Sequence, residues 1–525
     1  MRKNLLRIIA MMMAISMLLL AAACGAKDPA VQGEQQGNSA GDTNGETGKR
    51  DNLIVAINSS PATLDPYGTT DLPAARVTTN VFDTLVRIDE NNEVAPCLAE
   101  SWEIVDDLTY RFKIREGVKF HDGSELTVDD VAFSFKMNSQ SPHAVTVNTN
   151  IDFENCKVID EHTFEMKLKQ PFGPILRYMA AAVMAIVSEK SYTELGEDFG
   201  TKPVGTGPYK VVDWVTDDRI ELTRFDDYWG EPAKIKDVTV RLVPESTTRS
   251  IEVETGGIDI ACRVSASDVA RLEENPNITV DRQETYSTNF ICLTTTQPPL
   301  DNVLVRKAIN YAIDKEAILK VVYKGIGVIG SAPMSPTLFG YNDSLPQYTR
   351  DVEKAKQLLA EAGYADGFDI TISHNEDQVR GDICEMVQAQ LSEVGINVEI
   401  ETLEWGAFIE RVYEGSMQMF TLGWSASSGD PDVALYSCFH TDNFGAGGNM
   451  SFYSNPEVDE LLVKGRVSND DAVRKEAYMK AQEIIWDESP YVFLQHDTEI
   501  TAYNKNLQGF DCTPDCMIDF AELSW

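Results

Sequence analysis

The chain has 525 residues, of which 43% are hydrophobic and 24% are charged, so it holds enough apolar material for a large core and is not a disordered protein. At about 150 residues per domain, this length predicts roughly three domains or lobes and excludes a single small module. Lys and Arg total 45 against 83 Asp and Glu, a formal net charge of -38 that opposes binding to a phosphate backbone and excludes nucleic acid as an expected partner.

The first residues have the pattern of an export signal. Arg2, Lys3 and Arg7 precede an apolar run over residues 8–23, which is shorter than the roughly 20 apolar residues of a membrane-spanning helix. A basic start, a short apolar run and small residues before a break are typical of a secretory signal. The sequence AAACG around Cys24 resembles a bacterial lipobox, and this resemblance implies that Cys24 is diacylated and becomes the mature N-terminus. The alternative is an ordinary cleavable signal.

Residues 25–50 predict a disordered tether, because they are rich in Gly and in polar and acidic residues and hold almost nothing to pack. Two acyl chains are sufficient for stable anchoring to a membrane. We therefore expect an extracytoplasmic protein, anchored to the cell membrane by the lipid on Cys24, or a periplasmic one.

Residues 237–283 alternate between strand and helix patterns. Alternate apolar residues over 238–242 predict a strand, and residues 246–255 predict a helix that Gly256 ends. IDIA, then the helix SASDVARLEEN capped by Ser267, then ITVDRQ continue the alternation. TYSTNFICLTTT predicts an extended crossover to a second body, and YVFLQHDTEITAYN near the end of the chain predicts the return. Two crossings between the same two bodies predict a hinge.

Residues 368–423 repeat this alternation more clearly. FDITIS alternates apolar and polar residues, as a strand does. Apolar residues then recur every three or four positions over 383–394, as on one face of a helix, and Gly395 ends it. INVEIE, a second helix over about 407–413 and MQMFTLG complete a βαβαβ unit, which is typical of an open parallel sheet. The chain therefore predicts two α/β sheets.

The loops after these strands are the candidate binding positions, because ligands of open α/β sheets bind beyond the carboxyl ends of the strands. Loops from two lobes that face one cleft would enclose a small ligand when the hinge closes. In the first lobe these loops are Asn58–Ser60, Pro244–Ser246 and Cys262–Arg263, and in the second lobe they are Ser373–Asn375, Glu404–Trp405 and Trp424–Ser427.

Four segments follow one another in a recognisable order. LAESWEIVDDLTYRFKIREGVKFHDGSELTVDDVAFSFK, residues 98–136, is followed by PVGTGPYKVVDW, DDYWGEPAKIKDVTVRLVPE and VRKAINYAIDKEAIL. Together they resemble the family 5 solute-binding proteins, which serve ABC importers of peptides and nickel, and the resemblance extends over nearly all of residues 51–525. It implies an α/β, two-lobed periplasmic-binding-protein fold of the large, cluster C type, with an extra subdomain in lobe I and a hinge between the lobes.

The resemblance also implies the domain limits and the function. Lobe I would comprise residues 51–290 and 494–525, with the inserted subdomain at about 69–201, and lobe II would comprise residues 291–493. The protein would be the substrate-binding lipoprotein of an ABC importer, which captures a solute by lobe closure and delivers it to the permease subunits in the membrane. We expect a monomer without a cofactor, a metal or enzymatic activity.

The motif GWSASSGDPD, residues 423–432, bears on the ligand. Dipeptide-binding members place an Asp, which pairs with the α-ammonium group of the peptide, where this chain has Ser427. A hydroxyl cannot supply the charge-assisted hydrogen bond of a carboxylate. Asp430 reads as a structural turn residue. The segments SHN at 373–375, GWSAS, NMSFYSNPEVDELL and AQEIIWDESP resemble the glutathione-binding branch instead. We therefore expect a peptide-like solute, glutathione or a short peptide, with an oligosaccharide or a nickel chelate as alternatives.

Glutathione carries two carboxylates and one ammonium group, so its site needs at least one cation. Arg263 is the first candidate, with His374 and Arg76 behind it, and each could instead form a local ion pair. Trp405 and Trp424 could line the pocket or belong to the core, and the serines could contact the ligand or simply form turns. The predicted ligand-binding residues are Ser59, Ser60, Arg263, His374, Asn375, Trp405, Trp424, Ser425, Ala426 and Ser427.

A secreted hydrolase is the competing class of function. The sequence has neither a GxSxG nor an HExxH motif and contains 6 His. Among its 83 acidic residues, no two stand out as the carboxylate pair of a glycosidase.

The cysteines besides Cys24 leave many disulfide pairings open. Cys512 and Cys516 are the favoured local pair, and no second close pair accompanies them for a zinc site.

Overall fold

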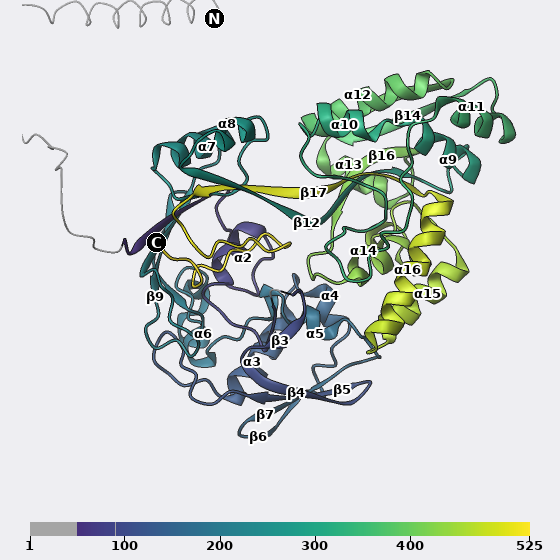
Figure 1. Ribbon diagram of the computed structural model, residues 1–525. Helices are drawn as coiled ribbons and strands as arrows, with labels where there is room; N and C mark the ends of the chain where they lie inside the picture. Colours follow the sequence, from purple (N-terminus) through teal and green to yellow (C-terminus); the bar gives the residue numbers. More distant parts are fainter. Residues whose placement is uncertain (1–49, 90) are drawn as a thin grey trace, which may run out of the picture. The chain divides into compact units, whose positions relative to one another are not determined.

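The computed structural model describes residues 50–89 and 91–525 (Figure 1). The predicted export signal, Cys24 and all of the predicted tether except Arg50 lie outside these residues. Arg50–Trp525 forms one compact unit. Within the described ranges, no helix is both long enough and apolar enough to cross a membrane. We keep the predicted names lobe I, subdomain and lobe II for the residue ranges given above.

One mixed sheet runs through both lobes. Its strands lie in the order β15-β14-β16-β12-β17-β11-β1-β10-β9-β8, and β13 pairs with β17. The prediction of two separate sheets is therefore wrong, because β12 (Ile278–Leu293) and β17 (Tyr491–Asn504) pair antiparallel and join the two halves (Figure 1). We call these two strands the ribbon. ITVDRQ and most of the predicted crossover form the single strand β12, and the predicted return segment is β17.

Lobe I is built around β1 (Asn52–Ile57), which lies parallel to both β10 and β11. Leu53, Val55 and Ile57 are buried in the core of this lobe, as the apolar alternation requires. The prediction that Ser267 caps α8 is wrong, because the N-cap residue is Asp268 and the Ser267 hydroxyl contacts Ser265. The other elements outside the subdomain are β8 (Tyr209–Val215), β9 (Arg219–Arg224), β10 (Asp237–Leu242), α7 (Ser246–Thr255), β11 (Ile260–Ala261) and α8 (Val269–Glu273).

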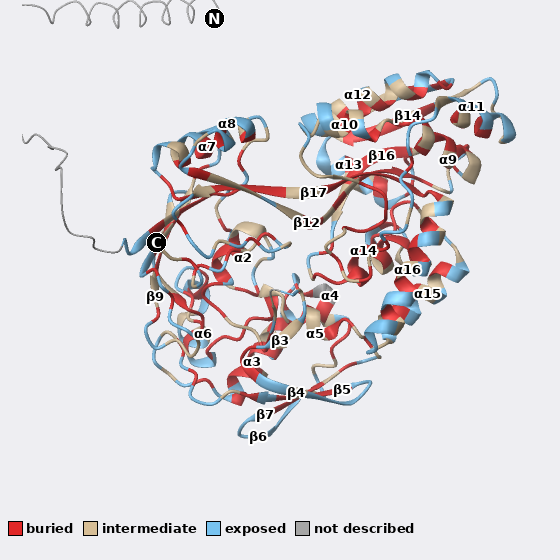
Figure 2. Cartoon of the chain, in the orientation of Figure 1, coloured by how far each residue is buried: buried red, intermediate tan, exposed pale blue. Residues whose placement is uncertain are grey.

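Lobe II contains the predicted βαβαβ unit. β14 (Phe368–Asn375) lies parallel to both β15 (Ile396–Leu403) and β16 (Met419–Ser425), with α12 and α13 between them in the chain. These strands and α12 enclose a buried core, which appears red in Figure 2. The helices and the short strand of lobe II are α9 (Val303–Ala312), α10 (Lys315–Val321), β13 (Val328–Ile329), α11 (Val352–Glu361), α12 (Gln378–Ser392), α13 (Trp405–Tyr413), α14 (Pro431–Phe439), η3 (Thr441–Asn443), η4 (Gly445–Gly447), α15 (Pro456–Val467) and α16 (Asp471–Glu488).

The subdomain holds a four-stranded antiparallel sheet, β4-β5-β7-β6, and the hairpin β2-β3. Its edge strands β4 and β6 are largely exposed, whereas β5 and β7 bury most of their side chains (Figure 2). The helix α3 packs on β6 and β7. The elements are α2 (Leu72–Thr78), β2 (Val86–Ile88), β3 (Val94–Pro96), β4 (Ala99–Asp106), β5 (Thr109–Ile114), α3 (Val128–Gln140), α4 (Val145–Asn148), β6 (Lys157–Asp160), β7 (Thr163–Lys167), α5 (Ile175–Tyr178), η1 (Ala182–Met184), α6 (Glu189–Leu195) and η2 (Gly196–Gly200).

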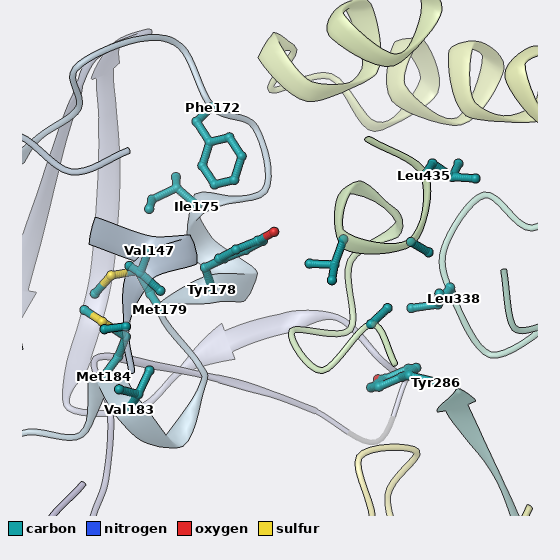
Figure 3. Close-up of a cluster of buried hydrophobic side chains, with 14 of the residues drawn as sticks. Val147, Phe172, Ile175, Tyr178, Met179, Val183, Met184, Tyr286, Leu338 and Leu435 are labelled. Carbon is teal, nitrogen blue, oxygen red and sulfur yellow. The ribbon is translucent and has the colours of Figure 1, made fainter. Parts of the chain in front are cut away.

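The subdomain also contacts lobe II directly. The Tyr178 hydroxyl donates to Asp432 at 3.3 Å, and the Gly173 amide donates to the Arg466 carbonyl at 2.8 Å. Tyr178 points away from its own helix toward lobe II in Figure 3, within a buried apolar cluster that contains residues of both bodies. These contacts hold the subdomain and lobe II together.

Replacing Gly173 with Ala tests this contact. A Cβ atom at Gly173 would lie 1.8 Å from the Ser468 carbonyl oxygen, so the two bodies must separate. Overpacking of this kind costs about 1–3 kcal/mol. If a ligand favours the state in which the subdomain contacts lobe II, its binding should weaken by roughly one to two orders of magnitude. Small-angle scattering and calorimetry measure the separation and the affinity. Gly257→Ala is the matched control, because the nearest atom to its Cβ is an ordinary contact at 3.5 Å; equal affinities for both variants would contradict the account.

Candidate functional site

The strand-end loops of lobe I lie on neighbouring strands. Asn58–Ser60 follow β1, and Arg263 follows β11, whose Ala261 pairs with Ala56 of β1. Ser59 is exposed and Ser60 is half-buried. The structure therefore brings the predicted serines and the predicted cation of this lobe to the same end of the sheet.

Arg263 is fixed by a buried carboxylate. Its Nε donates to Glu499 on the ribbon at 2.9 Å, and Glu499 also accepts from the guanidinium of Arg76 at 2.5 Å. Arg76 and Glu499 are buried, whereas the Arg263 side chain is 47% exposed. Within the described residues, no hydrogen bond uses the two terminal amino groups of Arg263. Arg263 is thus an oriented cation whose free N–H groups match a carboxylate, while Arg76 is buried and paired with Glu499.

A second arginine, Arg249, fixes the backbone of the loop after β11. The buried guanidinium of Arg249 donates to the carbonyls of Cys262 at 2.8 Å and Arg263 at 2.6 Å, and to those of Val243 and Pro244. It therefore ties the loop after β10 to the loop after β11. Arg263 adopts a positive φ of 54°, a strained conformation that these carbonyl contacts hold in place.

In lobe II, the loop GWSAS leaves β16 against the ribbon. The Ala426 amide donates to the Tyr286 carbonyl at 3.2 Å, and Ser425 pairs with Ser287 of β12. Ser425 and Ser427 are exposed, and Ala426 is buried. Trp424 is half-buried against the core, with its indole N–H donating to the Val433 carbonyl at 2.9 Å. The loop can offer two hydroxyls to a ligand. Trp424 attaches the loop to the core.

The two acids of GWSASSGDPD have structural partners. Both Asp430 oxygens accept from Arg474 at 2.8 Å, and Asp430 Oδ1 also accepts from the Asp432 amide, so Asp430 caps α14. Asp432 contacts Arg466 at 3.2 Å. Burial raises the pKa of Asp432 to about 6, and Arg466 opposes this rise. Neither carboxylate is free for a ligand.

The other predicted residues of lobe II have local partners. His374 is buried, and its ring nitrogens contact the Asn375 carbonyl at 2.7 Å and the Thr402 hydroxyl at 3.0 Å. The Asn375 side-chain oxygen accepts from Arg380 at 2.6 Å. Trp405 is 49% exposed at the start of α13 and stacks on Phe408. No hydrogen bond in the described part of the chain joins His374, Asn375 or Trp405 to GWSAS, so their place in the site stays a prediction.

Tyr286 is a further candidate site residue, which the sequence did not reveal. It lies in an irregular stretch of β12, where the pairing with β17 shifts register between Glu284 and Thr288. Its amide donates to the Pro514 carbonyl at 3.2 Å, its carbonyl accepts from Ala426, and its hydroxyl donates to Asn92 at 3.3 Å. Tyr286 thus joins the C-terminal loop, the GWSAS loop and the hairpin β2-β3. TYSTNF carries no local signal for this role.

Two surface hollows are present among the described residues, and the first of them includes Ser373 of the predicted loop Ser373–Asn375. One of about 400 Å³ lies over β14 and β15 and contains Ser373, Glu401 and Arg411, and one of about 770 Å³ lies on the subdomain beside Cys156. Among the residues that the structure describes, no three His, Cys, Asp or Glu side chains are arranged to hold a metal ion. The eight cysteines from Cys97 to Cys516 are free thiols in this structure.

Comparison with known proteins gives a consistent result. The family model described as "Bacterial extracellular solute-binding proteins, family 5 Middle" matches residues 93–446. The chain is 33% identical over 482 residues to "Glutathione-binding protein GsiB" of Escherichia coli (strain K12), covering 90% of this chain and 94% of the relative. Among solved structures, HbpA2 from Haemophilus parasuis is similar with a TM-score of 0.85 and 31% identity, over 90% of this chain and 99% of that one. The periplasmic binding protein DppA from Helicobacter pylori, in complex with the peptide STSA, is similar with a TM-score of 0.75 and 32% identity, over 91% and 98%.

Proposed function

The chain belongs to the family 5 bacterial extracellular solute-binding proteins, and we propose that it captures glutathione or a short peptide of similar charge and delivers it to an ABC permease. The predicted resemblance to this family, the two-lobed α/β fold and the general role as the solute-binding component of an importer are thereby confirmed. The identity of the solute, the site residues and the lipid anchor belong to the proposal.

One observation carries the choice of ligand. Arg263 is an oriented, half-exposed cation in lobe I, and the GWSAS loop of lobe II exposes the hydroxyls of Ser425 and Ser427, with no carboxylate at position 427. An anionic or zwitterionic solute suits this pair better than a cationic one. The relatives named as glutathione-binding proteins support the same class.

The proposed mechanism is closure without chemistry. A ligand that touches loops of both lobes binds the closed state more tightly than the open one and so shifts the population toward it. The permease would then recognise the closed state. No bond is made or broken, so this proposal excludes a secreted hydrolase. The lipid on Cys24 would keep the protein near the permease, and the intact mass of the mature chain tests that anchor.

A thermal-shift screen tests the proposal. The mature protein is mixed separately with glutathione, di- and oligopeptides, oligosaccharides and nickel chelates. A ligand at one hundred times its dissociation constant adds about 2.7 kcal/mol of stability, which is readily measured. We expect glutathione to give the largest shift. A shift with oligosaccharides or nickel chelates alone would contradict the proposal, as would the appearance of cleaved glutathione by mass spectrometry.

Replacing Trp424 with Ala should abolish the shift with glutathione, because the GWSAS loop loses the ring that supports it. The unliganded variant should still fold but melt at a lower temperature, since Trp424 packs on the core and bonds to Val433. Trp424→Phe keeps a ring without the N–H donor and should retain most of the shift. Calorimetry at equal protein concentrations separates affinity from stability. An undiminished affinity in Trp424→Ala would show that this loop does not form the site.

A further inference from the structure

The C-terminal loop CTPDC, residues 512–516, lies under the ribbon instead of at the periphery. The Cys516 carbonyl accepts from Arg76 Nε at 3.1 Å, which places this loop beside α2, as the yellow C-terminal segment in Figure 1 shows. Cys512 and Cys516 are both buried and anchor the loop. The Pro514 carbonyl accepts from the Tyr286 amide at 3.2 Å. The tip of the loop is therefore fixed at the irregular stretch of the ribbon.

This loop meets both halves of the candidate site. Tyr286 links Pro514 to Ala426 of GWSAS through its amide and carbonyl, and a segment in the C-terminal colour lies just below Tyr286 in Figure 3. On the other side, Arg76 links Cys516 to Glu499, and Glu499 orients Arg263. The loop is thus connected to the hydroxyls of lobe II and to the cation of lobe I by short chains of hydrogen bonds.

Asp515 lies in the chain between Pro514, which contacts Tyr286, and Cys516, which contacts Arg76. Asp515 is exposed to solvent, and desolvation by the surrounding protein is the main cause that raises the pKa of its carboxyl group. Its oxygen Oδ1 accepts from the Thr513 hydroxyl. No Lys, Arg or His in the described ranges forms an ion pair with it. A carboxylate of this kind is available to an incoming cationic group.

We propose that Asp515 receives the ammonium group of the bound solute and so replaces the carboxylate that the GWSAS loop lacks at Ser427. This inference rests on the proposed function and specifies it. A charge-assisted N–H···O bond to Asp515 at one end and the terminal N–H groups of Arg263 at the other would select solutes that carry both an ammonium and a carboxylate group. The acidic surface elsewhere offers many carboxylates, but Asp515 is joined by its loop to the contacts of both lobes.

The test compares the binding of two ligands to the mature chain and to its variants by calorimetry. The ligands are glutathione and its deamino analogue, glutaryl-cysteinylglycine, which differ by the ammonium group. The proteins are the mature chain, Asp515→Asn, and Asp511→Asn as a matched control, because Asp511 is an exposed acid of the same segment. The mature chain should bind glutathione roughly 10- to 150-fold more tightly than the analogue, the range of a hydrogen bond to a charged group.

In Asp515→Asn, glutathione should bind only as tightly as the analogue, whose own affinity should be unchanged, and Asp511→Asn should bind both ligands like the parent. Unchanged preference in Asp515→Asn would overturn the proposal, and so would an equal loss for both ligands, which indicates a structural role. Asp515→Glu, which keeps the carboxylate, should restore part of the preference. If the mature chain binds neither ligand, the proposed function and this inference both fail. If the mature chain prefers glutathione and Asp515→Asn loses that preference, the proposed function and this inference are both supported.

Discussion

Replacing Asp430 with Asn is expected to lower the free energy of unfolding by about 3–5 kcal/mol, the cost of removing one partner from a buried ion pair. Asp430 and Arg474 are 0% and 4% exposed, and both carboxylate oxygens accept from the same guanidinium. Asn can still cap α14, so the variant removes the charge and leaves the cap. Urea unfolding measures the change.

The control is Asp471→Asn, which removes a second acid near the same arginine. Asp471 lies 3.8 Å from Arg474 but is 79% exposed, so its loss should cost at most about 1 kcal/mol. The Asp430 charge contributes to the raised pKa of Asp432, so Asp432 should ionise more easily in Asp430→Asn and offset part of the cost. Equal stabilities of the two variants would show that the buried pair is not needed for folding.

Replacing Glu499 with Gln is expected to reduce both stability and affinity. The change leaves the buried Arg76 without its carboxylate, at a cost of about 3–5 kcal/mol. It also weakens the contact that orients Arg263, so a carboxylate ligand should bind more weakly. Chemical denaturation and calorimetry measure the two effects on the same preparation.

Arg263→Ala separates these effects. This variant keeps the pair between Arg76 and Glu499, and because Arg263 is 47% exposed its own contact should add little to stability. We therefore expect near-normal stability with a loss of affinity of at least tenfold. If Arg263→Ala binds glutathione like the parent, Arg263 is not the carboxylate anchor, and the affinity change in Glu499→Gln must be structural.

Local sequence patterns predicted the helices and strands of two segments, residues 237–283 and 368–423. The strand and helix periods in residues 368–423 correspond to β14, α12, β15, α13 and β16, and residues 246–255 form α7 as expected. The sequence predicts these elements because one face of each is buried, so apolar residues recur with the period of a strand or a helix. The order of motifs likewise sufficed to predict the family, the fold and the transport role.

Long-range pairings could not be read from the sequence. The join between the two sheets depends on β12 and β17, which lie about 200 residues apart in the chain and carry no mark of their pairing. The partners of Arg76 and His374, and the position of the C-terminal loop at Tyr286, depend on the assembled tertiary structure. The sequence therefore indicated candidate loops, but not which polar groups were already used inside the protein.

The central claim is that residues of both lobes grip one small solute without altering it. A crystal structure of the mature protein with glutathione tests this claim most directly. We predict intact glutathione in contact with Arg263 of lobe I and with the GWSAS loop of lobe II, with its ammonium group at Asp515. Glutathione bound to one lobe alone, bound away from these loops, or found cleaved would contradict the account.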